Sequence, residues 1–215
     1  MDRVCLDTTR MTEATAVSRA TAYAIFSLLI SSPHEVNPRD KITDIQLSEL
    51  PFDFDLEKIM NDFSLNDEDT LKKQFSALFE IGDHGPPIPI REDLFLNQPA
   101  KLKEDFVRFY VHFGYELDEG FHWQMDHLSI QLEFMHFLAM GEFEEQKDKL
   151  SYQLGQLDFT QKHLINWVPK LAEQLSVLSK EDEIYAKISI ELKTFLEHDL
   201  KWQEQTIKTI DESGG

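Results

Sequence analysis

The sequence has a single cysteine, Cys5, among its 215 residues. A lone thiol cannot form a disulfide within the chain, which is typical of proteins that work in a reducing compartment. The apolar core of a secretory signal is also missing, because residues 1–17 are mostly polar. We therefore expect a soluble protein of the cytoplasm.

Basic residues are scarce as well. Lysine and arginine total 21 against 40 aspartates and glutamates, which gives a formal net charge of −19. Contacts with phosphate groups need clustered lysine and arginine, so this balance argues against nucleic acid and anionic membrane surfaces as partners. The same charge favours a basic peptide or protein as partner, although it also serves solubility alone.

No apolar run is long enough for a membrane span. Met125–Met140 is strongly apolar, yet it is shorter than the ~20 residues that a bilayer requires, and Glu133 and His136 interrupt it. Glycine and proline are few, with eight of each against sixteen phenylalanines. This composition predicts a packed globule rather than a disordered or membrane-inserted chain.

The apolar side chains of Met125–Met140 cover nearly all sides of a helix. Leu128 and Leu132 mark one face, while Phe134 and Phe137 cover much of the rest. A helix that is apolar nearly all round is normally buried by its neighbours. We therefore expect a buried central helix in an all-α fold, a single globular domain of about seven to nine helices.

The rest of the chain shows helical periodicity and no strand pattern, repeat or dividing linker. Helices are expected at residues 12–32, 42–50, 55–63, 67–81, 101–113, 142–157, 158–178 and 181–210. Pro169 predicts a kink in one of them. Residues 82–99 hold four prolines and two glycines and predict a long, functional loop. The expected organisation is a disordered lead at 1–11, one helical domain at 12–210 and a flexible tail at 211–215.

Patterns of nucleophilic catalysis and of nucleotide binding are missing from the sequence. One pattern suggests a metal: Glu133 and His136 have the Glu-x-x-His spacing of di-iron helical bundles. A second match, Glu119 and His122, lies in a connector that contains glycine, where one-face geometry is not assured. A metal- or oxygen-dependent enzyme using Glu133 and His136 is thus one alternative. The other is that both residues are structural, polar side chains at the edge of a buried helix.

Asp126 and His127 stand where the chain enters the central helix. An aspartate at the N-cap accepts bonds from the first-turn N–H groups, and His127 has the alternative of a structural, buried role. Aromatic and acidic residues precede this point: Tyr115, Glu116, Asp118, Glu119, Phe121, His122 and Trp123. Acids beside aromatic rings suit a peptide that carries arginines and apolar side chains.

Four stretches, in order, resemble the TorD/DmsD/NarJ family of molybdoenzyme maturation chaperones. They are SRATAYAIFSLL (18–29) followed by Pro33, FSALF (75–79) with GPPIP (85–89), FYVHFG (109–114) with DHLSIQLEFM (126–135), and HLINWVP (163–169). The resemblance implies an all-helical cytoplasmic chaperone with no catalysis and no cofactor of its own. Such proteins bind the N-terminal leader of a molybdopterin enzyme's catalytic subunit, often a twin-arginine export signal, until the cofactor is inserted. They occur as monomers and as helix-swapped homodimers.

The resemblance places leader binding at Asp126 and His127 and at Glu92 in the proline loop. Proximity in sequence adds Tyr115, Glu116, Asp118, Phe121, Trp123 and Gln124. We expect the leader's arginines to meet the acids of this set and its apolar residues to lie near the aromatic rings.

The sequence departs from the family at two points of the predicted groove. Gln124-Met125 stands where the family has proline before Asp-His, and Ile90-Arg91-Glu92-Asp93 stands where it often has Pro-Tyr-Glu-Ser. These changes leave the client open. A third interpretation is a helical scaffold protein without leader specificity.

Overall fold

The computed structural model describes most of the chain. The described residues are 10–35, 38–42, 45–82, 85–97, 99–117, 124–145, 147–179 and 183–207. Within them the regular structure is helical, apart from isolated bridge residues, of which Arg91 and His127 pair with each other in antiparallel fashion. The predicted all-α fold class is therefore confirmed.

The described chain contains eight longer α-helices and two of five residues each. In order they are α1 (Thr12–Ile30), α2 (Pro38–Ile42), α3 (Leu56–Ser64), α4 (Glu68–Phe79), α5 (Glu92–Leu96), α6 (Pro99–Phe113), α7 (Leu128–Glu144), α8 (Lys149–Phe159), α9 (Ile165–Leu178) and α10 (Ile184–Thr206). A π-helical turn, η2 (Thr160–Leu164), joins α8 to α9.

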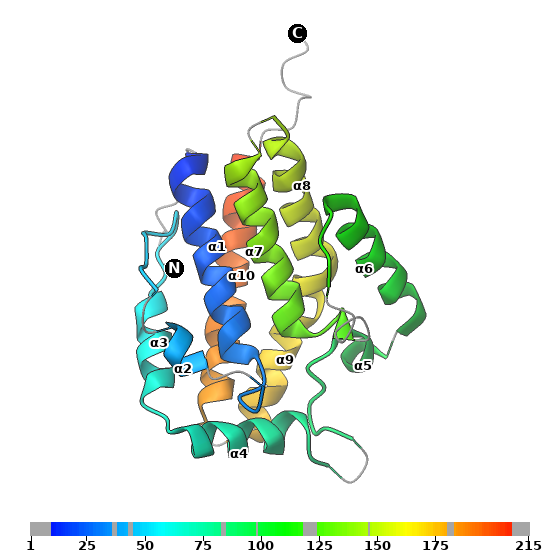
Figure 1. The fold of residues 1–215 in the computed structure, drawn as a ribbon. Helices are drawn as coiled ribbons and strands as arrows, with labels where there is room; N and C mark the ends of the chain where they lie inside the picture. The colour runs from blue at the N-terminus through cyan, green and yellow to red at the C-terminus, as the bar shows by residue number, and fades with distance from the viewer. Residues whose placement is uncertain are drawn as a thin grey trace.

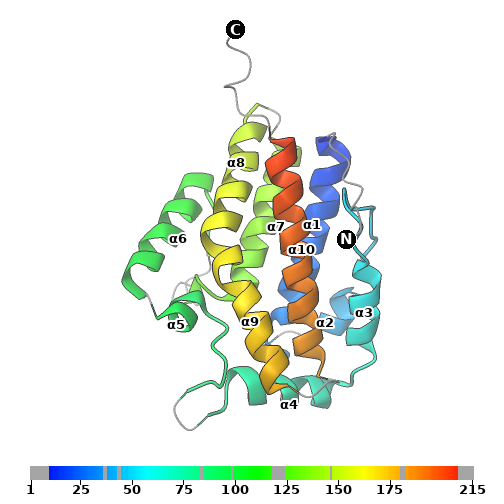
Figure 2. The ribbon, with the colours of Figure 1, turned by 180° about the vertical axis from the view of Figure 1, so that it is seen from behind.

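The long helices α1, α7, α8–α9 and α10 run alternately down and up the molecule (Figure 1). α7 packs mainly against α1 and α8, while α10 lies beside α9 (Figure 2). α4 lies across the lower end, and α6 stands outside α8. The centre of α7 is buried, as its pattern predicts: Leu132, Phe134 and Met135 are fully inaccessible to solvent.

α1 and α7 approach closely enough to exchange bonds between side chain and backbone. The Ser27 hydroxyl donates to the Ser129 carbonyl at 2.8 Å. Nδ1 of His136 lies 2.9 Å from the Ala20 carbonyl, so it carries the proton and donates. Small residues on α1 permit this approach, since the distance between helix axes follows the size of the side chains at the contact.

Two expected elements are placed differently. Residues 45–50, expected to be helical, form no regular structure. Ile45 and Leu47 both pack on the core there, and a spacing of two residues on one side belongs to an extended chain. Instead of separate helices at 142–157 and 158–178, α7 continues to Glu144 and α8, η2 and α9 run on without a break.

A π-helical turn precedes Pro169, where the sequence predicts a kink. Proline conflicts with the carbonyl four residues earlier, here that of Ile165, at the start of α9. Directly before it, the N–H of Ile165 bonds to the Thr160 carbonyl, the i to i−5 pattern of a π-helix. The turn widens the helix and directs His163 into the core.

The ends of the chain are described only in part. Arg10, placed in the predicted disordered lead, binds Glu142 through two nitrogens at 2.7 and 2.6 Å. Residues 1–9 and the predicted tail, 211–215, lie outside the described residues. None of the described helices combines the length and apolar character that crossing a bilayer requires.

Candidate functional site

A cleft of about 560 Å³ opens at the entrance to α7. It lies between the end of α1, α4, the proline loop and the segment 115–117. Its lining residues are Ser31, Ser32, Glu35, Phe75, Phe79, Glu80, Pro86, Pro89, Ile90, Arg91, Leu94, Tyr115, Glu116, Leu117, Gln124, His127, Ser129, Ile130 and Glu133. Two of the four motif stretches contribute to the lining, the second through Phe75, Phe79, Pro86 and Pro89 and the third through His127, Ser129, Ile130 and Glu133.

The cleft brings together four of the nine predicted site residues: Tyr115, Glu116, Gln124 and His127. Glu92 and Asp126 do not line it, because both are fully buried. Asp118, Phe121 and Trp123 lie outside the described residues, so their roles stay predictions.

The N-cap of α7 is His127, and the prediction that Asp126 fills this role is wrong. His127 has extended backbone angles, and its Nδ1 accepts the N–H of Ser129 at 3.2 Å and lies 2.8 Å from the Ser129 hydroxyl. Since Nδ1 accepts, the ring proton of the neutral form is on Nε2. Burial lowers the pKa of His127 to about 4, with Asp126 opposing and Arg91 adding to the effect. The imidazole is therefore neutral near pH 7.

Asp126 instead binds the proline loop. Its carboxylate accepts from Arg91 Nε at 3.1 Å and from the Asp93 N–H at 2.9 Å. The backbones pair as well: the Glu92 N–H donates to the Asp126 carbonyl and the Leu128 N–H to the Ile90 carbonyl. This bridge fixes the loop on the start of α7.

Asp93 and Asp126 share one guanidinium. Arg91 Nη2 lies 3.0 Å from Asp93 Oδ2 and 3.0 Å from Asp126 Oδ1. Burial and the neighbouring Asp126 raise the pKa of Asp93 to about 6. Burial opposes ionisation of Asp126 too, but the bonds from Asp93 and Arg91 outweigh it and lower its pKa. The pair binds a proton below about pH 6, and that proton resides on Asp93.

Glu92 joins the loop to the π-helical turn. Both of its carboxylate oxygens lie 3.3 Å from Nδ1 of His163. The His163 ring packs among Phe106, Phe109 and Phe159. Glu92 is thus a buried anchor of α5.

Three residues that support this entrance were not predicted as site residues. Arg91 and Asp93 bind the Asp126 carboxylate. The side-chain amide of Gln131 donates to the Asp126 backbone carbonyl at 2.9 Å, and its amide oxygen accepts from the Trp167 indole N–H. The only sequence signal was the departure of Arg91 and Asp93 from the family pattern. Nothing in the helical spacing marked Gln131.

Among the described residues, the metal alternative has no ligand set; Glu119 and His122 lie outside them. Glu133 is exposed and lines the cleft, whereas His136 bonds to the backbone of α1. Throughout the described ranges, no three or more histidine, cysteine, aspartate or glutamate side chains are grouped to hold a metal ion.

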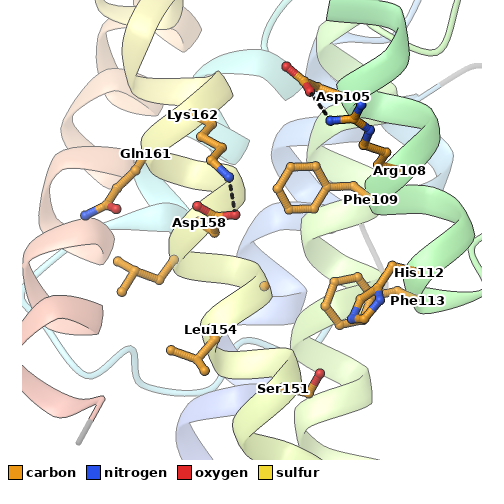
Figure 3. Close-up of a pocket in the computed structure, with 12 residues that line it drawn as sticks. Asp105, Arg108, Phe109, His112, Phe113, Ser151, Leu154, Asp158, Gln161 and Lys162 are labelled. Carbon is orange, nitrogen blue, oxygen red and sulfur yellow. Dashed lines mark hydrogen bonds and ion pairs between the residues drawn. The ribbon is translucent and has the colours of Figure 1, made fainter. Parts of the chain in front are cut away.

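A second cleft, of about 740 Å³, lies between α6 and α8–η2 (Figure 3). Phe109 and Phe113 of α6 form one wall. Its charged residues are paired locally, Asp105 with Arg108 at 3.6 Å and Asp158 with Lys162 at 2.6 Å. None of the predicted site residues that the structure describes lines it. The cleft at the α7 entrance is therefore the candidate site.

Known proteins resemble the chain in sequence. It is 34% identical over 108 residues to the perchlorate reductase assembly chaperone protein of Dechloromonas aromatica, covering 47% of this chain and 48% of that protein. It is 27% identical over 126 residues to the selenate reductase assembly chaperone protein of Thauera selenatis, covering 55% and 63%. It is 32% identical over 111 residues to the chaperone protein TorD of Vibrio parahaemolyticus, covering 48% and 51%. The matches span about half of the length of these relatives.

The fold also resembles a crystal structure from Archaeoglobus fulgidus, described as a candidate redox enzyme maturation protein. The TM-score is 0.53 at 20% identity, and the match covers 83% of this chain and 93% of that one. The family model for the nitrate reductase delta subunit matches residues 51–173, which include the proline loop, the α7 entrance and η2. This is more than half of the chain, which therefore belongs to the nitrate reductase delta subunit family, as its resemblance to TorD- and NarJ-type proteins predicts.

Proposed function

We propose that this chain is a cytoplasmic assembly chaperone for a molybdopterin-dependent reductase. It binds the N-terminal leader of the unfinished catalytic subunit in the cleft at the α7 entrance. It performs no catalysis itself, and its acidity favours a basic segment of the client.

The lining of the cleft is the observation that carries the proposal. An export leader has a positively charged segment followed by an apolar one. Four glutamates line the cleft: Glu35, Glu80, Glu116 and Glu133. Phenylalanine, proline and leucine side chains line the same space, and Leu94 is 52% exposed. One peptide can thus place arginines on carboxylates and apolar residues on the wall.

The relatives support the choice of client. Three are named as assembly chaperones of perchlorate, chlorate and selenate reductases. The matched part of this chain contains the whole entrance of α7.

Affinity purification of the chain from its native host tests the proposal first. We expect an unfinished molybdopterin reductase subunit to co-purify. Isothermal titration with a synthetic peptide of that subunit's leader then measures binding, which added salt should weaken because the contacts are charged. Co-purification without leader binding would place the contact elsewhere and overturn the cleft assignment.

A matched pair of leucine variants locates the contact. Leu94→Ser removes an exposed apolar side chain from the cleft, and Leu178→Ser removes one that is 60% exposed at the end of α9. We expect Leu94→Ser to weaken leader binding by about fivefold, from the lost apolar burial, and Leu178→Ser to leave it unchanged. Equal effects of the two would contradict the assignment.

A further inference from the structure

Arg91 is placed between the cleft and two buried carboxylates. It lines the cleft, and its side chain is 17% exposed. Asp126 and Asp93, which it binds, are 0% and 4% exposed and do not line the cleft. A peptide in the cleft therefore meets the guanidinium, and the carboxylate of Asp126 lies behind it.

The polar groups that Arg91 and His127 offer to a ligand are hydrogen-bond donors. A guanidinium has N–H donors and no acceptor. His127 is neutral with Nδ1 occupied by Ser129, which leaves Nε2–H as its donor. Neither group can accept a bond from an arginine of the peptide. Both can donate to the backbone carbonyls of an extended segment.

Carboxylates near the opening of the cleft have the opposite character. Glu116 and Glu133 line the cleft and are exposed. Within the part of the chain that the structure describes, no lysine, arginine or histidine forms an ion pair with either one. Glu80, by contrast, accepts from Ser76 and lies 3.7 Å from His34. Glu116 and Glu133, beside the α7 entrance, are thus acceptors for a guanidinium, as is the exposed Glu35 at the end of α1.

We propose that Arg91 determines which groups of the cleft bind the charged and the uncharged parts of a leader. It withdraws Asp126 from the ligand, directs the leader's arginines to Glu116 and Glu133, and with His127 donates to carbonyls of an adjacent uncharged stretch. Asp126 is then a positioning residue that acts through Arg91. This inference rests on the proposed leader binding and adds which residues carry its charge specificity.

Double-mutant cycles test the assignment of the arginines. The probe is a synthetic peptide with two adjacent arginines before a leucine- and alanine-rich stretch, compared with the same peptide carrying glutamines instead. Glu116→Gln and Glu133→Gln should each weaken binding of the arginine peptide about threefold, and the glutamine peptide should lose this dependence. Glu104→Gln, an exposed glutamate of α6 outside the cleft, is the matched control and should change nothing.

The role of Arg91 is tested by the double variant Arg91→Gln with Asp93→Asn. It removes one charge of each sign, keeps similar shapes and leaves Asp126 without its cation. We expect binding of the arginine peptide to strengthen about fivefold, and adding Asp126→Asn to abolish that gain. Arg91→Lys keeps the positive charge and should give no gain. Circular dichroism checks that each variant is folded.

The outcomes separate the two proposals. If the wild-type chain binds neither the arginine peptide nor its client's leader, the proposed leader binding fails, and this inference fails with it. If the wild type binds and the peptide arginines couple to Asp126 but not to Glu116 or Glu133, only the role of Arg91 is overturned. The side chains changed in Glu116→Gln and Glu133→Gln are exposed, so this comparison does not depend on the folding of the Arg91→Gln, Asp93→Asn double variant.

Discussion

At the start of α7, one arginine bridges two buried carboxyl groups. Asp126 contributes an acceptor to Arg91 and another to the Asp93 N–H, so its removal takes away one of the two carboxylates that Arg91 binds and the acceptor of a buried N–H. Breaking a largely buried ion pair and losing the acceptor of a buried N–H are costly, which makes Asp126 a determinant of stability as well as of the cleft's geometry.

Asp126→Asn should therefore lower the free energy of unfolding by about 3 kcal/mol, because Arg91 loses a buried partner. Urea denaturation followed by tryptophan fluorescence measures this, since Trp167 and Trp202 are fully buried. Glu133→Gln is the control and should stay within about 0.5 kcal/mol of wild type, because this side chain is exposed. A loss as small for Asp126→Asn would contradict the buried bond network.

Asp93 gives stability a dependence on pH. Its pKa is raised to about 6 in the folded chain, from an ordinary value of 3.8. Between these values the folded state holds a proton that the unfolded state has released, so this contribution to stability falls as pH rises from about 4 to 6. Asp93→Asn removes the effect. The variant should gain stability relative to wild type, by on the order of 1–3 kcal/mol, between pH 4 and pH 7.

Urea denaturation of wild type and Asp93→Asn across this pH range measures the difference. Asp126 does not titrate in this range, because its pKa is lowered. Its contribution to the free energy of unfolding is lost only as pH falls below about 4. A difference between the two proteins that stays constant with pH would show that Asp93 does not hold the proton.

The sequence marked Asp126 and His127 at this entrance but not their partners. Asp126 and His127 could be named from their position before an apolar helix. Which of them caps the helix depends on backbone angles that spacing alone does not reveal. The pairing of Arg91 with Asp126 spans 35 residues and became visible only once the loop was seen lying on α7.

Elements with strong periodicity were predicted well. α1, α4 and α7 lie within a few residues of their expected positions, because a long apolar stripe fixes both type and place. Two features escaped prediction for physical reasons. α5 is too short to show a period, and the π-turn η2 differs from an α-helix only in its backbone bonds.

The contact between α7 and α8 depends on a glycine. A Cβ at position 141 would lie 2.2 Å from the Tyr152 ring, closer than real Cβ atoms approach. Gly141→Ala should therefore destabilise the chain by about 1–3 kcal/mol, although alanine favours helix more than glycine does. Thermal unfolding by circular dichroism measures the change.

A second substitution at the same contact provides the control. In a Tyr152→Ala background the new methyl group has space, so Gly141→Ala should be neutral or stabilising there. If both backgrounds lose the same stability, the close approach of α7 and α8 does not set the choice of glycine.

Across the whole molecule, the cleft and a buried ionic network occupy opposite ends. α7 begins at the cleft and ends beside the start of α1 and the end of α10 (Figure 1). There the Glu142 carboxylate binds Arg10 and lies 3.6 Å from Arg19, which also binds Asp199. The network ties four parts of the chain together at the end of α7 opposite the cleft.

Glu142→Gln tests this separation. It leaves Arg10 and Arg19 short of a buried counter-charge and should lower the free energy of unfolding by about 3 kcal/mol. Glu144→Gln, two residues further along α7 and exposed, should have little effect. Arg10 and Arg19 outweigh burial and lower the pKa of Glu142, so its contribution is present above about pH 4.5 and is lost as pH falls through the folded-state value.

The affinity of Glu142→Gln for the leader should stay at the wild-type value although its free energy of unfolding falls. The folded fraction of Glu142→Gln should bind the leader peptide as wild type does, because none of its network residues lines the cleft. Titration at a temperature where the variant is fully folded separates the two quantities. A loss of affinity there would mean that the ends of α7 are coupled, and that the ionic network positions the cleft as well as stabilising the bundle.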